Sequence, residues 1–399
     1  MRLQAARFSP VVSKPELEKQ VLNFLQEELW EYLHDGKIYT ASLVIRTGPT
    51  DGFPLEDVLT NLLKRAITDG PSSAAKAFES CTENTSAVYQ HFSLLTGIHI
   101  KEPMQVFDGI WLLPLHAPTL GLPAYFPTFA GTPSGVEFMH RSILSIDYSV
   151  MPIFHRPDPE DINGNRRPSA YFTSTINSDE GRTFNRHIFC QALSLTCNSA
   201  VQIAMSWNHL GDDEIFNLGL GIGMGYRFSS RASAQTNAPA PSDIDMNETK
   251  RIYAELIGLS QNTQDSLQIP INRWIKSKAE GTAVDRMIDL GIAFESLYLA
   301  GRNDEIAFTF RLRASWYLGK DADDRKELMR KFNQIYQNRS KAVHTGILGH
   351  NLKFGQVSIR TKKFIEGAQD LCLQSILKVI QDGKIREDKD WNSVVLGGL

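Results

Sequence analysis

The chain has 399 residues, 42% of them hydrophobic and 22% charged, which predicts a large buried core. This length favours two domains over one. Its 45 acidic and 42 basic residues give a formal net charge of −3. This balance excludes a protein that binds nucleic acid through a uniformly basic surface, so any RNA affinity must come from a local basic patch.

Membrane and secretion signals are missing from the sequence. No stretch has the apolar length needed to span a bilayer, and the N-terminal segment MRLQAARFSPVV lacks the apolar core of a secretion signal. The cysteines show neither pairing nor metal-ligand spacing, so we expect free, largely buried thiols (Cys81, Cys190, Cys197 and Cys372). These features predict a cytoplasmic protein with no membrane association, no metal and no cofactor.

The first 228 residues mix helical and strand patterns and predict an α+β domain. Helical periodicity covers 15–34 and 53–69, with Gly70 ending the second segment. Apolar residues alternate with polar ones at Ile146, Tyr148 and Val150, and again at Val201, Ile203, Met205 and Trp207. The apolar, Pro- and Gly-rich stretch 104–126 indicates strands joined by tight loops.

Small, polar and proline residues dominate 229–247, which indicates a linker. Asn247 has the character of a helix N-cap, and every apolar pattern from 248 to 399 has the helical period. The expected helices are 248–260, 270–279, 283–300, 304–318, 324–344 and 361–382. Left-handed helix ends are expected at Gly301, Gly319, Gly346 and Gly383.

Three charged residues occupy positions where this periodicity predicts core residues: Glu295, Arg313 and Arg339. An isolated buried charge is very costly, so each should pair or face a cleft. One interpretation is a Glu–Arg pair that joins helices of the bundle. The other is that Arg339 lies at the rim of a polar site.

Arg339 also begins an Arg-x4-His string, RSKAVH, that ends at His344. An imidazole can abstract the proton of a ribose 2′-hydroxyl, and a guanidinium can hold the phosphate. Residues five apart on an ideal helix point about 140° from each other. The two side chains therefore meet on one phosphate only if the helix ends near His344 or a second subunit supplies the partner.

A second string of the same form, RTFNRH, runs from Arg182 to His187 in the N-terminal part. Two such strings in one chain show that the pattern alone is weakly specific. The surrounding sequence must decide which of them has a function.

The surroundings of the C-terminal string resemble the ApeA-like branch of the HEPN family over nearly the whole helical part. The resemblance is carried by the glutamate of GIAFESL, the arginine of RLRASWYLG and the string in YQNRSKAVHTG. These residues are Glu295, Arg313, Arg339 and His344, and three of them are the charged residues singled out by periodicity.

The resemblance implies a helical bundle that dimerises to form a composite RNase site. It implies metal-independent cleavage that leaves a cyclic phosphate and a free 5′-hydroxyl, with Arg339 and His344 catalytic and Glu295 and Arg313 supporting them. It also implies a toxin or anti-phage role, with an antitoxin or a phage component as a further partner. The N-terminal domain would select the target or sense the trigger.

Near the string, the segment 325–341 contains six basic residues and one acidic residue, Glu327. Arg330, Lys331 and Lys341 are candidates for contacts with an RNA backbone, and Ser340 is an auxiliary polar group. A solvated helix face is the alternative for the outer lysines. For the whole protein, the first hypothesis is a ribonuclease, with tRNA as a candidate substrate. The alternative is a non-catalytic HEPN module that dimerises and binds nucleotides or partners.

Overall fold

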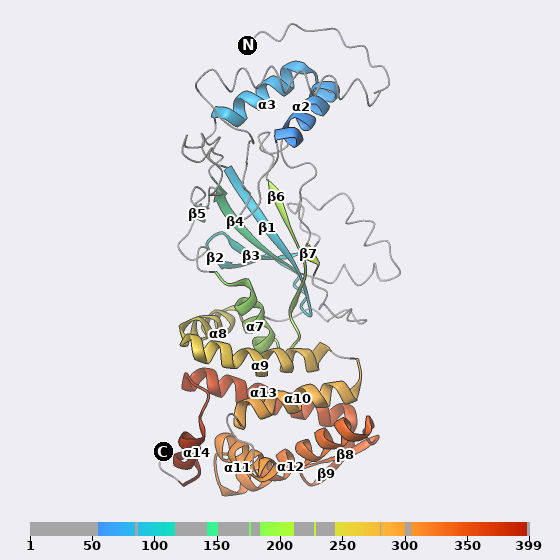
Figure 1. The fold of residues 1–399 in the computed structure, drawn as a ribbon, viewed down its shortest axis with the longest axis vertical. Helices are drawn as coiled ribbons and strands as arrows, with labels where there is room; N and C mark the ends of the chain where they lie inside the picture. Colours follow the sequence, from blue (N-terminus) through green and yellow to red (C-terminus); the bar gives the residue numbers. More distant parts are fainter. Residues whose placement is uncertain are drawn as a thin grey trace, which may run out of the picture.

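The computed structural model describes residues 55–83, 87–115, 142–150, 175–176, 184–210, 227–228, 244–279, 281–299 and 305–396. These residues form a sheet region followed by a mostly helical part (Figure 1). The predicted helix 15–34 and most of the predicted linker lie outside the described residues.

The N-terminal region contains an antiparallel sheet of seven strands with order β2-β3-β4-β1-β6-β7, and β5 pairs with β4. The strands are β1 (Ala87–Thr96), β2 (Met104–Phe107), β3 (Ile110–Pro114), β4 (Ser142–Val150), β5 (Thr175–Ile176), β6 (Gln202–Leu210) and β7 (Arg227–Phe228). The strands predicted around 146–150 and 201–207 are therefore confirmed, as is the tight turn within 104–126, where Gly109 has φ +66° between β2 and β3.

Helices α2 (Leu55–Asp69) and α3 (Pro71–Glu83) lie at the end of the sheet farthest from the helical part (Figure 1). Gly70 separates them with φ +92°, as the sequence predicts for the end of the first. Helix α7 (Arg186–Thr196) covers the opposite end of the sheet and packs against α8.

The helical part is built from seven helices in the described residues. They are α8 (Met246–Gly258), α9 (Gln261–Ala279), α10 (Ala283–Tyr298), α11 (Ile306–Leu318), α12 (Ala322–Thr345), α13 (Thr361–Asp382) and α14 (Asp388–Leu396). Gly346 and Gly383 end α12 and α13 in the left-handed conformation, whereas Gly319 ends α11 in an extended one.

Besides the extended Gly319, four further details of the helical prediction are wrong. The N-cap of α8 is Asp245, which accepts a hydrogen bond from Glu248 N, and Asn247 lies inside the helix. Helix α9 begins at Gln261, with Pro270 in its interior. Helix α14 was not expected. A two-stranded hairpin, β8 (Asn351–Phe354) and β9 (Val357–Arg360), interrupts the region 248–399, which periodicity predicts to be entirely helical.

One cluster of buried residues runs from the sheet through α7 into the helices. Tyr253 of α8 stands at the joint, where its hydroxyl accepts a hydrogen bond from Asn185 N at 2.9 Å. Its ring packs against three phenylalanines of the N-terminal region: Phe107, Phe184 and Phe189. The two parts of the chain therefore share buried surface across the predicted linker.

Candidate functional site

Helix α12 carries the Arg-x4-His string, and its sequence accounts for both of its ends. Asp321 caps the N-terminus by accepting hydrogen bonds from Asp323 N and Asp324 N. Leu328, Phe332 and Ile335 are buried along one side. The helix continues through His344 to Thr345, so Arg339 and His344 lie on one unbroken helix.

Arg339 forms an ion pair with Glu295 of α10. The distance between Arg339 Nη2 and Glu295 Oε2 is 2.9 Å, and the two side chains are only 25% and 30% exposed. Burial raises the pKa of the Glu295 carboxyl, and the charge of Arg339 opposes this rise. The Glu–Arg pair predicted from charged residues at core positions of the helices is present, and it joins α10 to α12.

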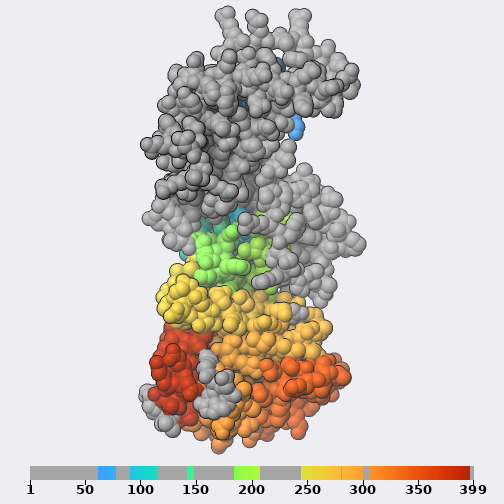
Figure 2. All heavy atoms as spheres, viewed as in Figure 1, coloured from blue at the N-terminus to red at the C-terminus, as the bar shows by residue number. Residues whose placement is uncertain are grey.

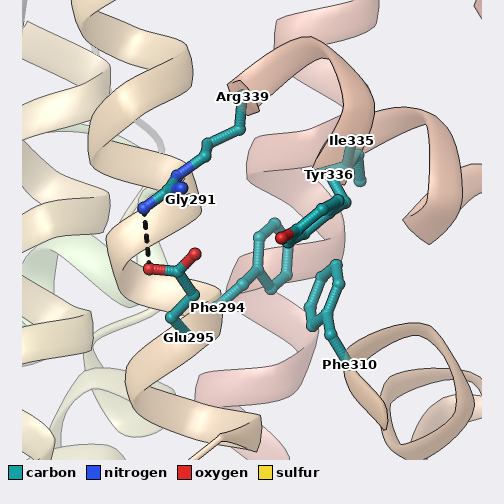
Figure 3. A pocket seen from close by; sticks show the side chains of 7 residues that line it. All are labelled: Gly291, Phe294, Glu295, Phe310, Ile335, Tyr336 and Arg339. Carbon is teal, nitrogen blue, oxygen red and sulfur yellow. Dashed lines mark hydrogen bonds and ion pairs between the residues drawn. The ribbon is translucent and has the colours of Figure 1, made fainter. Parts of the chain in front are cut away.

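The pair lies at the edge of a small pocket with about 200 Å³ of empty space, part of it open to solvent. Figure 3 shows the guanidinium of Arg339 directed at Glu295 while three aromatic rings gather beside them. The lining residues are Gly291, Phe294, Glu295, Phe310, Ile335, Tyr336 and Arg339. The pocket thus combines one cation, one carboxylate and a phenol above an apolar floor.

Gly291 allows this arrangement because the side chain of Arg339 crosses α10 at this position. A Cβ atom on residue 291 would stand 2.2 Å from Arg339 Cγ and 3.0 Å from its Nε. The Nε atom is itself buried without a hydrogen-bond partner in the described part of the chain. Arg339 can therefore take this path across α10 only because residue 291 has no side chain.

His344 is exposed in the last turn of α12. Among the described residues its ring has no hydrogen-bond or ion-pair partner, so nothing within this part of the chain orients it. Val343 and Ile347 beside it are 48% and 64% exposed, which is unusual for large aliphatic side chains. The surface around His344 is therefore a polar ring flanked by uncovered apolar groups.

Arg313 is not brought to the pocket. It is 4% exposed, donates to Tyr298 O at 2.9 Å and to Asp388 Oδ1, and lies 5.5 Å from the centre of the Trp391 ring. The sequence predicts that Arg313 either pairs or faces a cleft. It pairs, and its partner is Asp388 at the start of α14. This geometry gives Arg313 a structural contact that holds the C-terminal helix.

The other candidates lie at different places along α12. Arg330 pairs with Glu327 at 3.3 Å, and Lys331 Nζ lies 5.3 Å from the centre of the Phe354 ring. Lys341 is exposed, and Ser340 is half-buried with no hydrogen bond from its hydroxyl in the described residues. Arg330 and Lys331 are thus partly engaged, whereas Lys341 is free to contact a ligand.

In the second Arg-x4-His string, Arg182 lies outside the described residues, and His187 is exposed in the first turn of α7. Of the cysteines, Cys190 and Cys372 are buried free thiols and Cys197 is a half-buried one, as predicted. Burial raises the pKa of Cys190 to about 12 and that of Cys197 to about 11, so neither is suited to nucleophilic chemistry.

Sequence reasoning missed Gly291, Tyr336 and Asp388. A signal existed for Gly291, because it precedes Glu295 by one helical turn, and for Tyr336, which precedes Arg339 by three residues on the same helix. No signal marked Asp388, an exposed residue in a short polar segment.

No helix among the described residues has the length and apolar character to cross a membrane. Comparison of the chain with protein-family models, with curated proteins and with solved structures finds no match.

Proposed function

We propose that the chain is an endoribonuclease of HEPN type that cleaves RNA without a metal, with Arg339 and His344 as catalytic residues. One observation carries the proposal. Glu295 and Gly291 hold the arginine of the string in a defined position at a pocket, while the histidine of the same helix stands exposed and unpartnered among the described residues.

In the proposed reaction, His344 removes the proton of a ribose 2′-hydroxyl. The 2′-oxygen attacks the adjacent phosphorus, and the bond from phosphorus to the 5′-oxygen breaks. The leaving oxygen takes a proton from a protonated imidazole or from water, so the products are a 2′,3′-cyclic phosphate and a free 5′-hydroxyl. The guanidinium of Arg339 would stabilise the negative charge that builds up on the phosphate oxygens.

The orientation of the two side chains favours a site built from two copies of the chain. Helix α12 is unbroken from Arg339 to His344, so their side chains leave the helix about 140° apart. The exposed Val343 and Ile347 offer apolar surface that a second copy can cover. We therefore propose a homodimer through the helical part, in which each chain completes the other's site.

The second candidate is a non-catalytic module that dimerises and binds nucleotides or partners. The ion pair favours it, because Glu295 already neutralises the guanidinium that the reaction would need. The exposed apolar residues serve this function equally well. The two candidates differ in whether RNA bonds are broken.

The deciding experiment incubates the purified protein with end-labelled tRNA and total RNA, with and without excess EDTA. We expect fragments with cyclic phosphate ends in both conditions and none from the His344→Ala variant. Activity that disappears in EDTA and returns with magnesium or manganese would contradict the mechanism. Intact RNA in all conditions would favour the non-catalytic module.

A further inference from the structure

From Leu328 to Ile365 the chain contains no aspartate or glutamate, although acids outnumber bases in the whole chain. The same stretch holds eight lysines and arginines: Arg330, Lys331, Arg339, Lys341, Lys353, Arg360, Lys362 and Lys363. It covers most of α12, the β8–β9 hairpin and the start of α13. Arg330, Arg339 and Lys363 pair with acids that lie outside this stretch, so the excess positive charge of the segment comes from the other five cations.

The hairpin sorts its residues into two faces. Leu352, Phe354 and Ile359 pack on the hydrophobic core, while Lys353 and Arg360 are exposed on the outer face, opposite Ser358 and Asn351 respectively. Strand alternation thus places both cations on the side away from the core. Neither side chain has an ion pair or hydrogen bond within the described residues.

Helix α12 fixes the position of the hairpin. The side chain of Gln334 accepts from Gly355 N at 2.7 Å and donates to Gly355 O at 2.9 Å, which ties the turn to the middle of the helix. Phe354 packs on Phe364 of α13 with a centroid distance of 5.3 Å. The turn of the hairpin thus lies beside Lys331 and Gln334 of α12, and residues 346–350 join the open end of the hairpin to the end of that helix.

The start of α13 strengthens the positive potential. Arg360 occupies the N-cap position without a side-chain cap, and Lys362 and Lys363 lie in the first turn, which contains no acid. Lys363 pairs with Glu366 farther along the helix at 2.8 Å, so Arg360 and Lys362 carry the argument here. Acids occur in the first turns of α8, α10, α12 and α14 and are absent from those of α9 and α11, so the distinguishing feature of α13 is its cations. Cations next to the positive end of a helix dipole oppose helix stability, so folding alone does not account for them.

We infer that the outer face of the β8–β9 hairpin and the start of α13 bind the phosphate backbone of the RNA substrate on one side of the cleaved bond. Lys353, Arg360 and Lys362 make these contacts and extend the basic surface beyond Lys341. This inference rests on the proposed function, since the RNA is its substrate. Figure 2 shows the orange part of the chain, to which this segment belongs, on the open surface of the helical part.

The test measures binding of a labelled single-stranded RNA to the His344→Ala protein at several salt concentrations. The variant Lys353→Gln/Arg360→Gln/Lys362→Gln should bind about tenfold or more weakly, and the slope of log K against log salt should fall by about 2. In the double variant Lys353→Gln/Lys362→Gln the slope should fall by about 1.4. This variant keeps Arg360, the N-cap residue of α13, and so tests binding without a change at the helix end.

The matched control is Lys64→Gln/Lys76→Gln/Lys101→Gln, which removes three exposed lysines from the N-terminal region. It should leave the salt slope unchanged. An equal loss in both triple variants, or none in the hairpin triple, would overturn the inference. Cleavage by the wild type is scored separately, so RNA binding through the hairpin without cleavage would reject only the ribonuclease proposal. Cleavage with an unaffected hairpin triple would reject only this inference.

Discussion

Arg339 of α12 passes over Gly291 of α10 so closely that a Cβ atom on residue 291 would stand 2.2 Å from Arg339 Cγ. The contact is near the base of the arginine side chain, where a rotation cannot relieve it without moving the guanidinium. The position of the proposed catalytic arginine thus depends on a residue that makes no polar contact with it.

Gly291→Ala should reduce RNA cleavage by roughly 100-fold, because the displaced guanidinium no longer reaches the phosphate. Alanine otherwise favours a helix, so the folded state should remain populated. The control is Gly258→Ala at the end of α8, where a Cβ meets nothing within 4 Å. Rates measured on labelled RNA provide the comparison, and unchanged cleavage by Gly291→Ala would disprove this dependence.

The Glu295–Arg339 pair predicts a pH-dependent stability. Burial holds the folded-state pKa of Glu295 above its unfolded value, and loss of Arg339 raises it further. When a carboxyl has a higher pKa in the folded protein than in the unfolded one, the folded state loses stability as the pH rises from the unfolded-state pKa through the folded-state pKa. Arg339→Met should therefore be destabilised by about 1–3 kcal/mol at pH 7.5 and by less at pH 5.

The measurement for this pair is urea unfolding at both pH values. The double variant Arg339→Met/Glu295→Gln serves as the control, because it removes the orphaned carboxylate together with its partner. It should recover part of the stability at pH 7.5. A loss in Arg339→Met that is equal at the two pH values would show that the carboxylate is not responsible.

The two Arg-x4-His strings can be separated by four single variants. His344→Ala should abolish cleavage and leave the unfolding free energy within about 0.5 kcal/mol of the wild type, because the ring is exposed. Arg339→Ala should also abolish cleavage. Arg182→Ala and His187→Ala should retain it. Circular dichroism checks folding, and the opposite pattern of activities would move the active site to the N-terminal region.

The proposed dimer predicts that the surface next to His344 is covered in solution. Ile347→Asp should shift the protein towards monomer in sedimentation velocity and lower cleavage in parallel, because a charge disfavours burial of this surface. Ile67→Asp is the matched control, since Ile67 of α2 is 65% exposed and Ile347 is 64% exposed. A wild-type protein that is monomeric and active at every assay concentration would exclude the composite site.

The sequence predicted the helices of the C-terminal part and the Glu295–Arg339 pair for the same reason. A periodic apolar stripe marks the buried side of each helix, and a charge on that stripe requires a partner. The hairpin was missed because its strands are only four residues long, although Gly355 and Gln356 between them are a typical two-residue turn. Arg313 also lies on a stripe, but its partner Asp388 does not, so periodicity could not identify that contact.

The start of α9 was misplaced for a different reason. A proline is common in the first turn of a helix, and Pro270 follows a largely polar segment, so periodicity favoured a start at that residue. The buried side chains of Thr263 and Leu267 instead extend the helix to Gln261. Packing against the rest of the protein decided this boundary, and that packing is not encoded locally.

The aromatic joint around Tyr253 has a consequence for how the protein can be dissected. Phe107, Phe184 and Phe189 cover the ring of Tyr253, so a fragment beginning at residue 244 would carry this surface uncovered into water. Such a fragment should self-associate through the exposed surface of α8. Oligomers formed by the isolated helical part would then report on that newly exposed surface of α8 and not on the neighbourhood of His344 in α12.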